Sequence, residues 1–351
     1  MGCLLLPATL HERVVAEHVD IEALHRRVAV ADGHADSLMW NRDLTQASDE
    51  GHVDFPRLQA AGVKLQCFTV VTRGLPLVDG FSLFARHRKW PTRARASEWS
   101  RCTFQIDRLA HFCRESNGAA SIAGKAAHLD ANLKEGRISA VLGVEGAHAL
   151  EGKVERVAEL YERGVRFMSL THLANNELGG TCTRFFGNRP LTPLGREVLD
   201  AMGEVGMAVD VAHASPAMLP DVLGHPKARP FCSHAGVKGA TDMWRNLPDE
   251  ALKAIAQRGG VVGVIFAPQF LGGASLEHLA RHIEHAVNVM GEDGAALGSD
   301  FDGMVPLPQG MRDVRDLPKL TGTLLDRGMP VRIVEKVLGN NFRRFFGELL
   351  P

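Results

Sequence analysis

The stretch VAVADGHADSLMW (residues 28–40) begins as a run of small and β-branched apolar residues and ends in ionisable side chains, His34 and Asp36. A short, nearly continuous apolar run is typical of a strand buried on both faces of a parallel sheet. Residues two apart on a strand point to the same side of the sheet. His34 and Asp36 are therefore predicted to lie together at the end of a buried strand.

Apolar runs of strand length recur through the rest of the chain, and stretches with helical spacing separate them. With the first run, they occupy residues 28–32, 63–71, 139–144, 165–170, 207–212, 229–233, 260–267 and 295–299. Eight buried strands that alternate with helices predict an α/β chain whose parallel sheet closes into a (β/α)8, TIM-like barrel.

Two of the intervening helices have clear end signals. In LTPLGREVLDAMGEVG (191–206), Thr192 precedes Pro193 as an N-cap, and in NLPDEALKAIAQRGG (246–260) Asn246 is the candidate cap and Gly259 the stop. Residues 73–136 are longer than one helix with its loops needs. We expect one catalytic domain over residues 1–351, with an inserted helical segment at about 73–136 that covers the barrel mouth.

The composition excludes several kinds of partner. The chain has 40 basic and 41 acidic residues, so nothing favours binding to nucleic acid. Its six cysteines form no C-x-x-C pair and are expected to be reduced thiols. We find neither a signal-peptide pattern nor a run of about 18 apolar residues, and expect a soluble, cytoplasmic protein without a membrane partner. A homodimer is compatible with the sequence.

Most of the strand-like runs end in a residue that binds metals or transfers protons. These residues are His34 and Asp36 after the first run, Glu145 after the third, His172, His213 and His234 after the next three, and Asp300 after the eighth. Barrel active sites form at the carboxyl ends of the strands. Imidazoles and carboxylates without thiolates favour zinc, manganese or cobalt.

The number of candidate ligands predicts two ions rather than one. His34, Asp36, Glu145, His213 and His234 exceed the three protein ligands of an open catalytic zinc. A bridging Glu145 would give each ion three ligands, and a close pair of ions can share a hydroxide and polarise a carbonyl. Asp300 would then be free to take and return a proton.

Several separated motifs resemble the membrane (renal) dipeptidase family of zinc metallopeptidases, which are amidohydrolase-like barrels. They lie between about residues 32 and 346 and include DGHAD, GVEGAH, GVRFMSLTH, FCSHAG, RNLPDEAL, GSDFDG and LGNNFRRFF. The resemblance implies a zinc-dependent dipeptidase that hydrolyses the peptide bond of small dipeptides with a metal-bridging hydroxide.

The same resemblance implies a role for each site residue. His34 and Asp36 would hold one Zn²⁺ and His213 and His234 the other, with Glu145 bridging the two ions. His172 would bind the substrate and its developing oxyanion, Asp300 would carry the proton to the leaving amine, and Arg245 would bind the substrate carboxylate.

One difference from the family leaves more than one class of substrate compatible with the sequence. Ala267 corresponds to a tyrosine that helps the renal enzyme bind its substrate, so the stereochemistry at the second residue is not fixed. An amidase or lactamase that acts on another small amide with the same metal pair is the alternative. A binding protein that has lost turnover is disfavoured because the ligand set is intact.

Four further groups have a structural and a functional interpretation. Asp210 is expected to have a structural or outer-sphere role, and Asp302 to be a turn residue. His278, His282 and His285 are expected to pack or be exposed on a helix rather than bind metal. His148 either orients the substrate or the bridging carboxylate, or has no role in the site.

Overall fold

The computed structural model describes residues 19–74, 80–183 and 187–351. The amino-terminal residues, for which we predicted no signal peptide, lie outside these ranges. In the described part of the chain, every helix is too short or too polar to span a bilayer.

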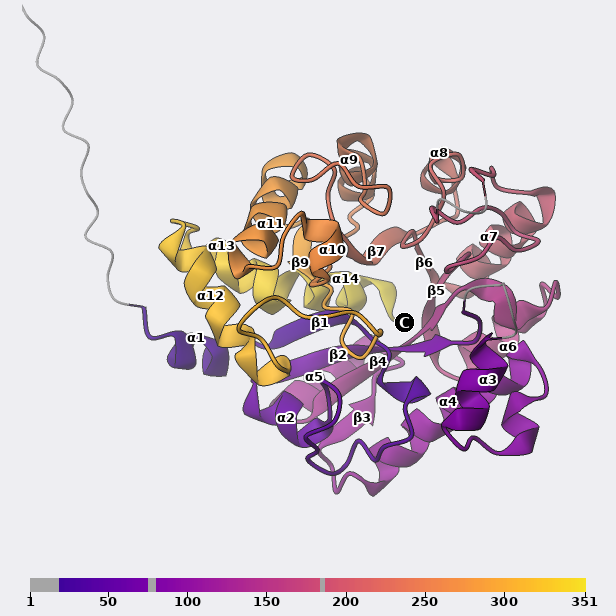
Figure 1. Cartoon of the computed structure of the whole chain (residues 1–351), viewed down its shortest axis with the longest axis horizontal. Helices are drawn as coiled ribbons and strands as arrows, with labels where there is room; N and C mark the ends of the chain where they lie inside the picture. The colour runs from indigo at the N-terminus through magenta and orange to yellow at the C-terminus, as the bar shows by residue number, and fades with distance from the viewer. Residues whose placement is uncertain (1–18, 75–79, 184–186) are drawn as a thin grey trace, which may run out of the picture.

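Eight parallel strands close into a barrel (Figure 1). The ring order is β2–β1–β9–β8–β7–β6–β5–β4, and pairing between β2 and β4 closes it. The predicted (β/α)8 fold is confirmed, and each of the eight apolar runs contains or overlaps one strand. The strands are β1 (Val30–Ala35), β2 (Val63–Val71), β4 (Ile138–Glu145), β5 (Val165–Ser169), β6 (Ala208–Asp210), β7 (Pro230–Ala235), β8 (Val262–Val264) and β9 (Ala295–Leu297).

A ninth strand, β3 (Ala120–Ile122), lies outside the ring and was not predicted. It pairs with residues 138–140 of β4, on the edge where β5 pairs with residues 142–144. The remainder of segment 73–136 contains α3 (Gly80–His87), the 3₁₀ turn η2 (Thr92–Arg95), α4 (Glu98–Glu115) and α5 (Ala126–Lys134).

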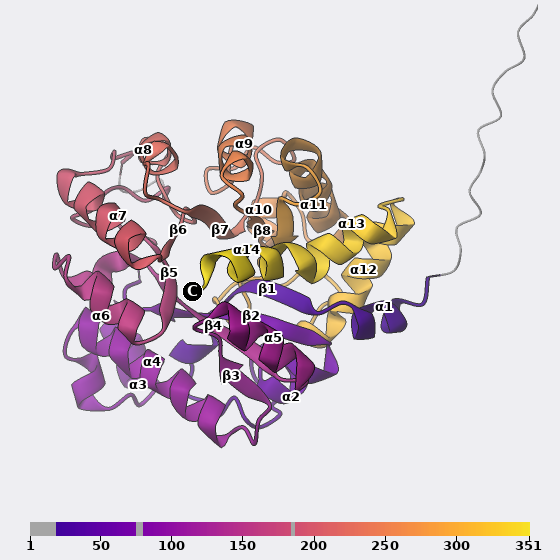
Figure 2. The ribbon, with the colours of Figure 1, turned by 180° about the vertical axis from the view of Figure 1, so that it is seen from behind.

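The other helices surround the barrel in both views (Figures 1 and 2). Thr192 caps α7 as predicted, since its side chain accepts a hydrogen bond from the Gly195 amide. The prediction that Asn246 caps α9 is wrong: Pro248 takes that place, and the Asn246 amide donates to the carbonyls of Thr241 and Phe270. These helices are α1 (Ile21–Arg27), α2 (Phe55–Ala60), α6 (Arg156–Glu162), α7 (Pro193–Val205), α8 (Leu219–Gly224), α9 (Asp249–Gln257), α10 (Pro268–Leu271), α11 (Leu276–Met290), α12 (Leu317–Asp326), α13 (Val331–Glu335) and α14 (Asn341–Leu349).

Helix α14 lies across one end of the barrel (Figure 2), and its aromatic side chains join a buried cluster with strand residues. Phe342 and Phe346 are fully buried and meet Phe231, on β7. The Phe342 ring also reaches the backbone of β1, where a Cβ atom at Gly33 would lie 2.5 Å from its Cζ. The polar strand ends lie at the opposite end of the barrel.

Replacing Phe342 with alanine should lower the free energy of unfolding by about 3–5 kcal/mol, because it removes a fully buried ring and leaves a cavity. Urea denaturation of the variant measures this loss. Leu83→Ala, at a side chain that is 57% exposed, serves as the control and should change stability by less than about 0.5 kcal/mol. A loss below about 1 kcal/mol in Phe342→Ala would contradict a stabilising role for the packing of this ring against β7 and β1.

The histidines of α11 have packing roles, as expected. The Val237 amide donates to Nδ1 of His282 over 3.0 Å, and His278 and His285 contact Ser275 and Asp249. Burial lowers the pKa of His282 to about 4. Because the Val237 amide donates to Nδ1, this nitrogen must stay unprotonated for the hydrogen bond to form.

We expect His282 to make stability fall as the pH drops. The folded-state pKa of about 4 lies below the unfolded value of about 6.5, so the contribution is complete above pH 6.5 and is lost towards pH 4. This loss amounts to about 3 kcal/mol between pH 7 and pH 4. Chemical denaturation of wild type and His282→Gln at both pH values isolates it, because other groups titrate equally in the two proteins. Parallel pH profiles would contradict the assignment.

Candidate metal centre

The residues predicted for the site lie together at the carboxyl ends of the strands. A cavity of about 540 Å³ opens there. His34 is fully buried beneath its floor. The remaining predicted residues line the cavity: Asp36, Glu145, His172, His213, His234, Arg245 and Asp300.

Glu145, the last residue of β4, lies at the centre of this group. Its Oε1 is 3.0 Å from Nε2 of His213, 3.3 Å from Nε2 of His234 and 3.6 Å from Nε2 of His34. Its Oε2 is 3.4 Å from Nε2 of His172. One carboxylate therefore faces imidazoles that come from four different strand ends.

Two adjoining sets of donor atoms include residues that line the cavity, and a third set, His34, Asp210 and His234, shares a histidine with each of them. Glu145, His213 and His234 form one group whose ligand atoms lie within 4.8 Å of one another. His34, Asp36 and Asp300 form the second. The first group matches one predicted set of ligands. The second brings Asp300 next to His34 and Asp36, while His34 also faces Glu145.

These residues fit divalent cations. Glu145 Oε1 is buried and has no hydrogen-bond donor among the described residues, and Nε2 of His213 lies only 3.1 Å from Nε2 of His234. At this spacing the ring nitrogens and the carboxylate oxygen all face one point. A positive charge at that point would stabilise the arrangement. Imidazoles and carboxylates without a thiolate are ligands that zinc accepts.

The electrostatics of the site follow from burial and the central carboxylates. Burial opposes charge on His34, but Glu145 and Asp36 raise the pKa of His34 to about 10. Burial, together with the positive charges of His34 and Arg245, lowers the pKa of His234 well below its usual value. Burial also raises the pKa of Asp300, and the carboxylates of Asp36 and Glu145 raise it further.

His172 and Arg245 lie on the cavity wall beside the centre. Nδ1 of His172 is 3.2 Å from the carbonyl oxygen of Arg73, which accepts its hydrogen. The Arg245 guanidinium is 3% exposed and donates to the carbonyl oxygen of His234 over 2.8 Å. Among the described residues, no carboxylate forms an ion pair with Arg245, so its charge is available to an anionic ligand.

Two site residues have strained backbones. His213 and Asp300 have φ angles of 65° and 62°, in the left-handed region that few residues other than glycine adopt. Such a conformation costs about 1–3 kcal/mol and is typical of functional sites. Each residue lies three positions after the end of a barrel strand, β6 or β9.

Sequence reasoning missed two hydroxyl groups beside the ligands. Thr69, inside the run 63–71, donates to Asp36 Oδ1 over 2.6 Å and lies 3.2 Å from Nε2 of His34. Ser233, inside the run 229–233, contacts the rings of His34 and His234. A hydroxyl side chain within a largely apolar run was the only available signal.

The remaining candidate residues, Asp210, Asp302 and His148, have different surroundings. The Asp210 carboxylate accepts from Ser233 and from the Ala212 amide, as an outer role requires, and it also lies within 4.8 Å of donor atoms of His34 and His234. Asp302 has a φ of 65°, as a turn residue would, but it is also buried and ion-paired with Arg42. His148 is buried outside the cavity lining, and its ring makes no hydrogen bond to any described residue, so it orients neither Glu145 nor a ligand in the cavity.

Ala267 is fully buried and does not line the cavity. The chain after β8 instead presents Ile265, Gln269 and Phe270 to the cavity. Any substrate contact from this part of the barrel therefore comes from those three side chains.

Comparisons with known proteins agree with this geometry. Residues 19–349 match the family model described as membrane dipeptidase (peptidase family M19). The chain is 32% identical to dipeptidase aclJ of Aspergillus oryzae over 351 aligned residues, covering 94% of this chain and 80% of that protein. A metallo peptidase of Rhodobacter sphaeroides, solved with a phosphinate mimic of the dipeptide L-Ala-D-Ala, superposes with a TM-score of 0.80 at 25% identity, covering 92% of this chain and 99% of that one. The probable dipeptidase PvdM of Pseudomonas aeruginosa shares the fold, with a TM-score of 0.81 at 20% identity, covering 94% of this chain and 97% of that one.

Proposed function

The chain belongs to the membrane dipeptidase family of metallopeptidases, and on that premise we propose that it hydrolyses small dipeptides at a binuclear zinc centre. His34 and Asp36 would hold one ion, His213 and His234 the other, and Glu145 would bridge them. The observation that carries the proposal is the buried Glu145 Oε1, which faces three imidazole nitrogens within 3.6 Å and has no hydrogen-bond donor among the described residues.

When bound, two zinc ions would supply Lewis acidity towards the peptide carbonyl and would lower the pKa of a bound water, so that hydroxide could serve as the nucleophile near neutral pH. The protein's own residues bind and orient the substrate and transfer protons. Arg245 offers an unpaired guanidinium to the carboxylate of the second residue, which favours a dipeptide over a longer chain.

His172 and Asp300 would act on the reacting groups. Because Nδ1 of His172 donates to the Arg73 carbonyl, Nε2 can donate to a developing oxyanion only when the ring is doubly protonated. Asp300 lies beside His34 and Asp36, and its burial favours the protonated carboxyl. It can therefore hold the proton that the leaving amine receives.

Zinc analysis and a dipeptide library test the proposal together. We expect about two zinc ions per chain and cleavage of dipeptides, with both L and D residues at the second position in the library. The mimic of L-Ala-D-Ala bound by the Rhodobacter sphaeroides relative makes the D series essential. His213→Ala should lose zinc and activity together. A folded protein that takes up no zinc would refute the proposal.

Another small amide is the second candidate substrate. The observation in its favour is that Ala267 is buried away from the cavity, while apolar side chains such as Phe81 and Phe270 line it. A screen of cyclic amides beside the dipeptides separates the two. Cleavage of cyclic amides without cleavage of any dipeptide would select this alternative.

Replacing Arg245 with methionine should raise the KM for dipeptides by on the order of 100-fold, because a charge-assisted hydrogen bond contributes about 1.5–3 kcal/mol. Steady-state kinetics with a dipeptide and its carboxamide measure the effect. The carboxamide lacks the carboxylate and should lose much less between wild type and variant. Equal losses for both substrates would show that Arg245 does not bind the carboxylate.

A further inference from the structure

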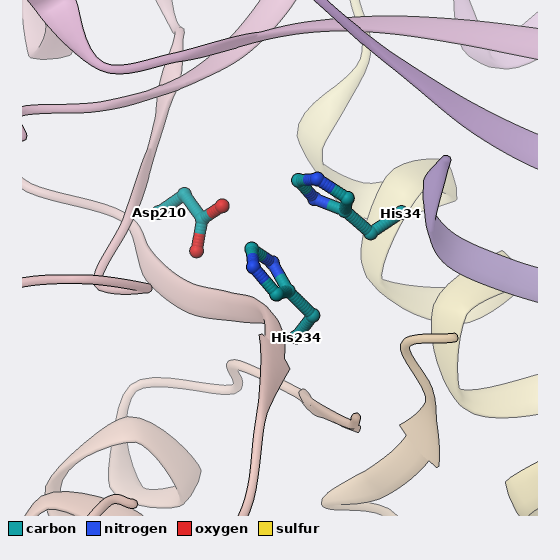
Figure 3. Close-up of side chains that lie close together, drawn as sticks. All are labelled: His34, Asp210 and His234. Carbon is teal, nitrogen blue, oxygen red and sulfur yellow. The ribbon is translucent and has the colours of Figure 1, made fainter. Parts of the chain in front are cut away.

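The Ser233 hydroxyl lies behind the metal centre, between ligands of its two halves. Its Oγ is 3.1 Å from Nδ1 of His34 and 2.8 Å from Nδ1 of His234. It also donates to Oδ2 of Asp210 over 2.5 Å. Figure 3 shows the Asp210 carboxylate turned towards the two imidazole rings. All four side chains are at most 3% exposed.

The donors and acceptors around the Ser233 hydroxyl determine the direction of each of its hydrogen bonds. Oδ1 of Asp210 accepts the amides of Ala212 and Ser233, and Oδ2 takes the single hydroxyl hydrogen of Ser233. The Ser233 oxygen then has only lone pairs to offer to the rings. Both rings must therefore carry a hydrogen on Nδ1, which leaves Nε2 as the nitrogen that each can offer to a metal ion.

We propose that Ser233, oriented by Asp210, is a positioning residue that fixes the metal-binding tautomer of one histidine in each half of the centre. The inference rests on the two-zinc function proposed above. Partners of this kind orient a ligand ring and typically change metal affinity by 10- to 100-fold. Here one hydroxyl serves both ions, so losing it should weaken both.

The same barrel contains a matched pair that contacts no ring nitrogen. Ser299 donates its amide to Oδ1 of Asp32 over 2.7 Å and its hydroxyl to Oδ2 over 2.8 Å, as Ser233 does with Asp210. Ser299 is 1% exposed and, like Ser233, precedes a site residue. Ser299→Ala therefore removes a buried serine–aspartate hydrogen bond, together with contacts to the His34 carbonyl and the Phe301 amide, without touching an imidazole.

Zinc affinity, measured by competition with a chromophoric chelator, tests the inference. We expect Ser233→Ala to bind both ions about 10- to 100-fold more weakly than wild type. Ser299→Ala should stay within about threefold of wild type, although both variants lose some thermal stability as metal-free proteins. Wild-type affinity in Ser233→Ala, or equal losses in the two variants, would overturn the inference.

Asp210→Asn provides a second variant that keeps the side-chain shape. Its amide can donate to Ser233, which then turns its hydrogen towards one ring and forces that ring to protonate Nε2. We expect zinc content to fall from about two ions per chain to about one, with a matching loss of intensity in the cobalt(II) absorption spectrum. Two tightly bound ions in Asp210→Asn would also overturn the inference. A wild-type chain without zinc affinity would instead refute the proposed function.

Discussion

Glu145→Gln should reduce zinc binding from two ions per chain to one or none and lower dipeptide hydrolysis by about 10²- to 10⁴-fold. The carboxylate is 3% exposed, and its Oε1 faces three imidazole nitrogens. Glutamine keeps the shape but removes the charge that balances two cations, and removing one partner of a buried charge pair costs about 3–5 kcal/mol. A loss of that size corresponds to roughly 10³-fold in rate when it falls on the transition state.

Zinc content by elemental analysis and kcat/KM for one cleaved dipeptide check this expectation. Glu159→Gln, on the exposed surface of α6, removes the same charge away from the centre and should behave as wild type. Circular dichroism shows whether both variants are folded. Two zinc ions and activity within tenfold of wild type in Glu145→Gln would exclude Glu145 as the bridging ligand.

The barrel was predictable because its strands are buried on both faces. Such strands appear in the sequence as apolar runs, and β2 and β4 extend over nearly the whole of their predicted ranges. The strand β3 was not predictable, since its three residues carry no pattern of their own and pair only with the start of β4. The role of α14 was also hidden, because its aromatic face meets barrel residues that are distant in sequence.

The site residues that lie at strand ends could be predicted, because the apolar runs in the sequence show where those strands end. Glu145 and His234 directly follow apolar runs and His34 lies two residues after one, so a closed barrel brings them together. The supporting hydroxyls could not be found in this way. Ser233 is separated from His34 by 199 positions, and a serine within a buried run looks the same whether it contacts a ligand ring or only backbone. Pairing of this kind depends on the register between strands, which the sequence pattern does not specify.

Asp300→Asn should lower kcat by about 10²–10⁴-fold while both zinc ions and the KM for dipeptides are retained. Asparagine has the same shape but cannot take up and return a proton, and loss of general acid–base catalysis typically has this size. The left-handed backbone at residue 300 accommodates asparagine as readily as aspartate. A Cβ atom at Gly303 would lie 1.9 Å from Asp300 Oδ1, so this tight turn favours a replacement of the same size.

Zinc content and kcat, measured together in Asp300→Asn, distinguish two roles for this carboxylate. Asp300 lies within 4.8 Å of the donor atoms of His34 and Asp36, close enough to be a ligand of the first ion. A ligand role requires Asp300→Asn to lose about one zinc ion, whereas a proton-transfer role requires two ions and a lower kcat. Asp326→Asn, on the exposed surface of α12, should change neither quantity. Because Glu145 already faces both halves of the centre, each ion of the proposed pair would have three protein ligands without Asp300, and we therefore expect the proton-transfer outcome.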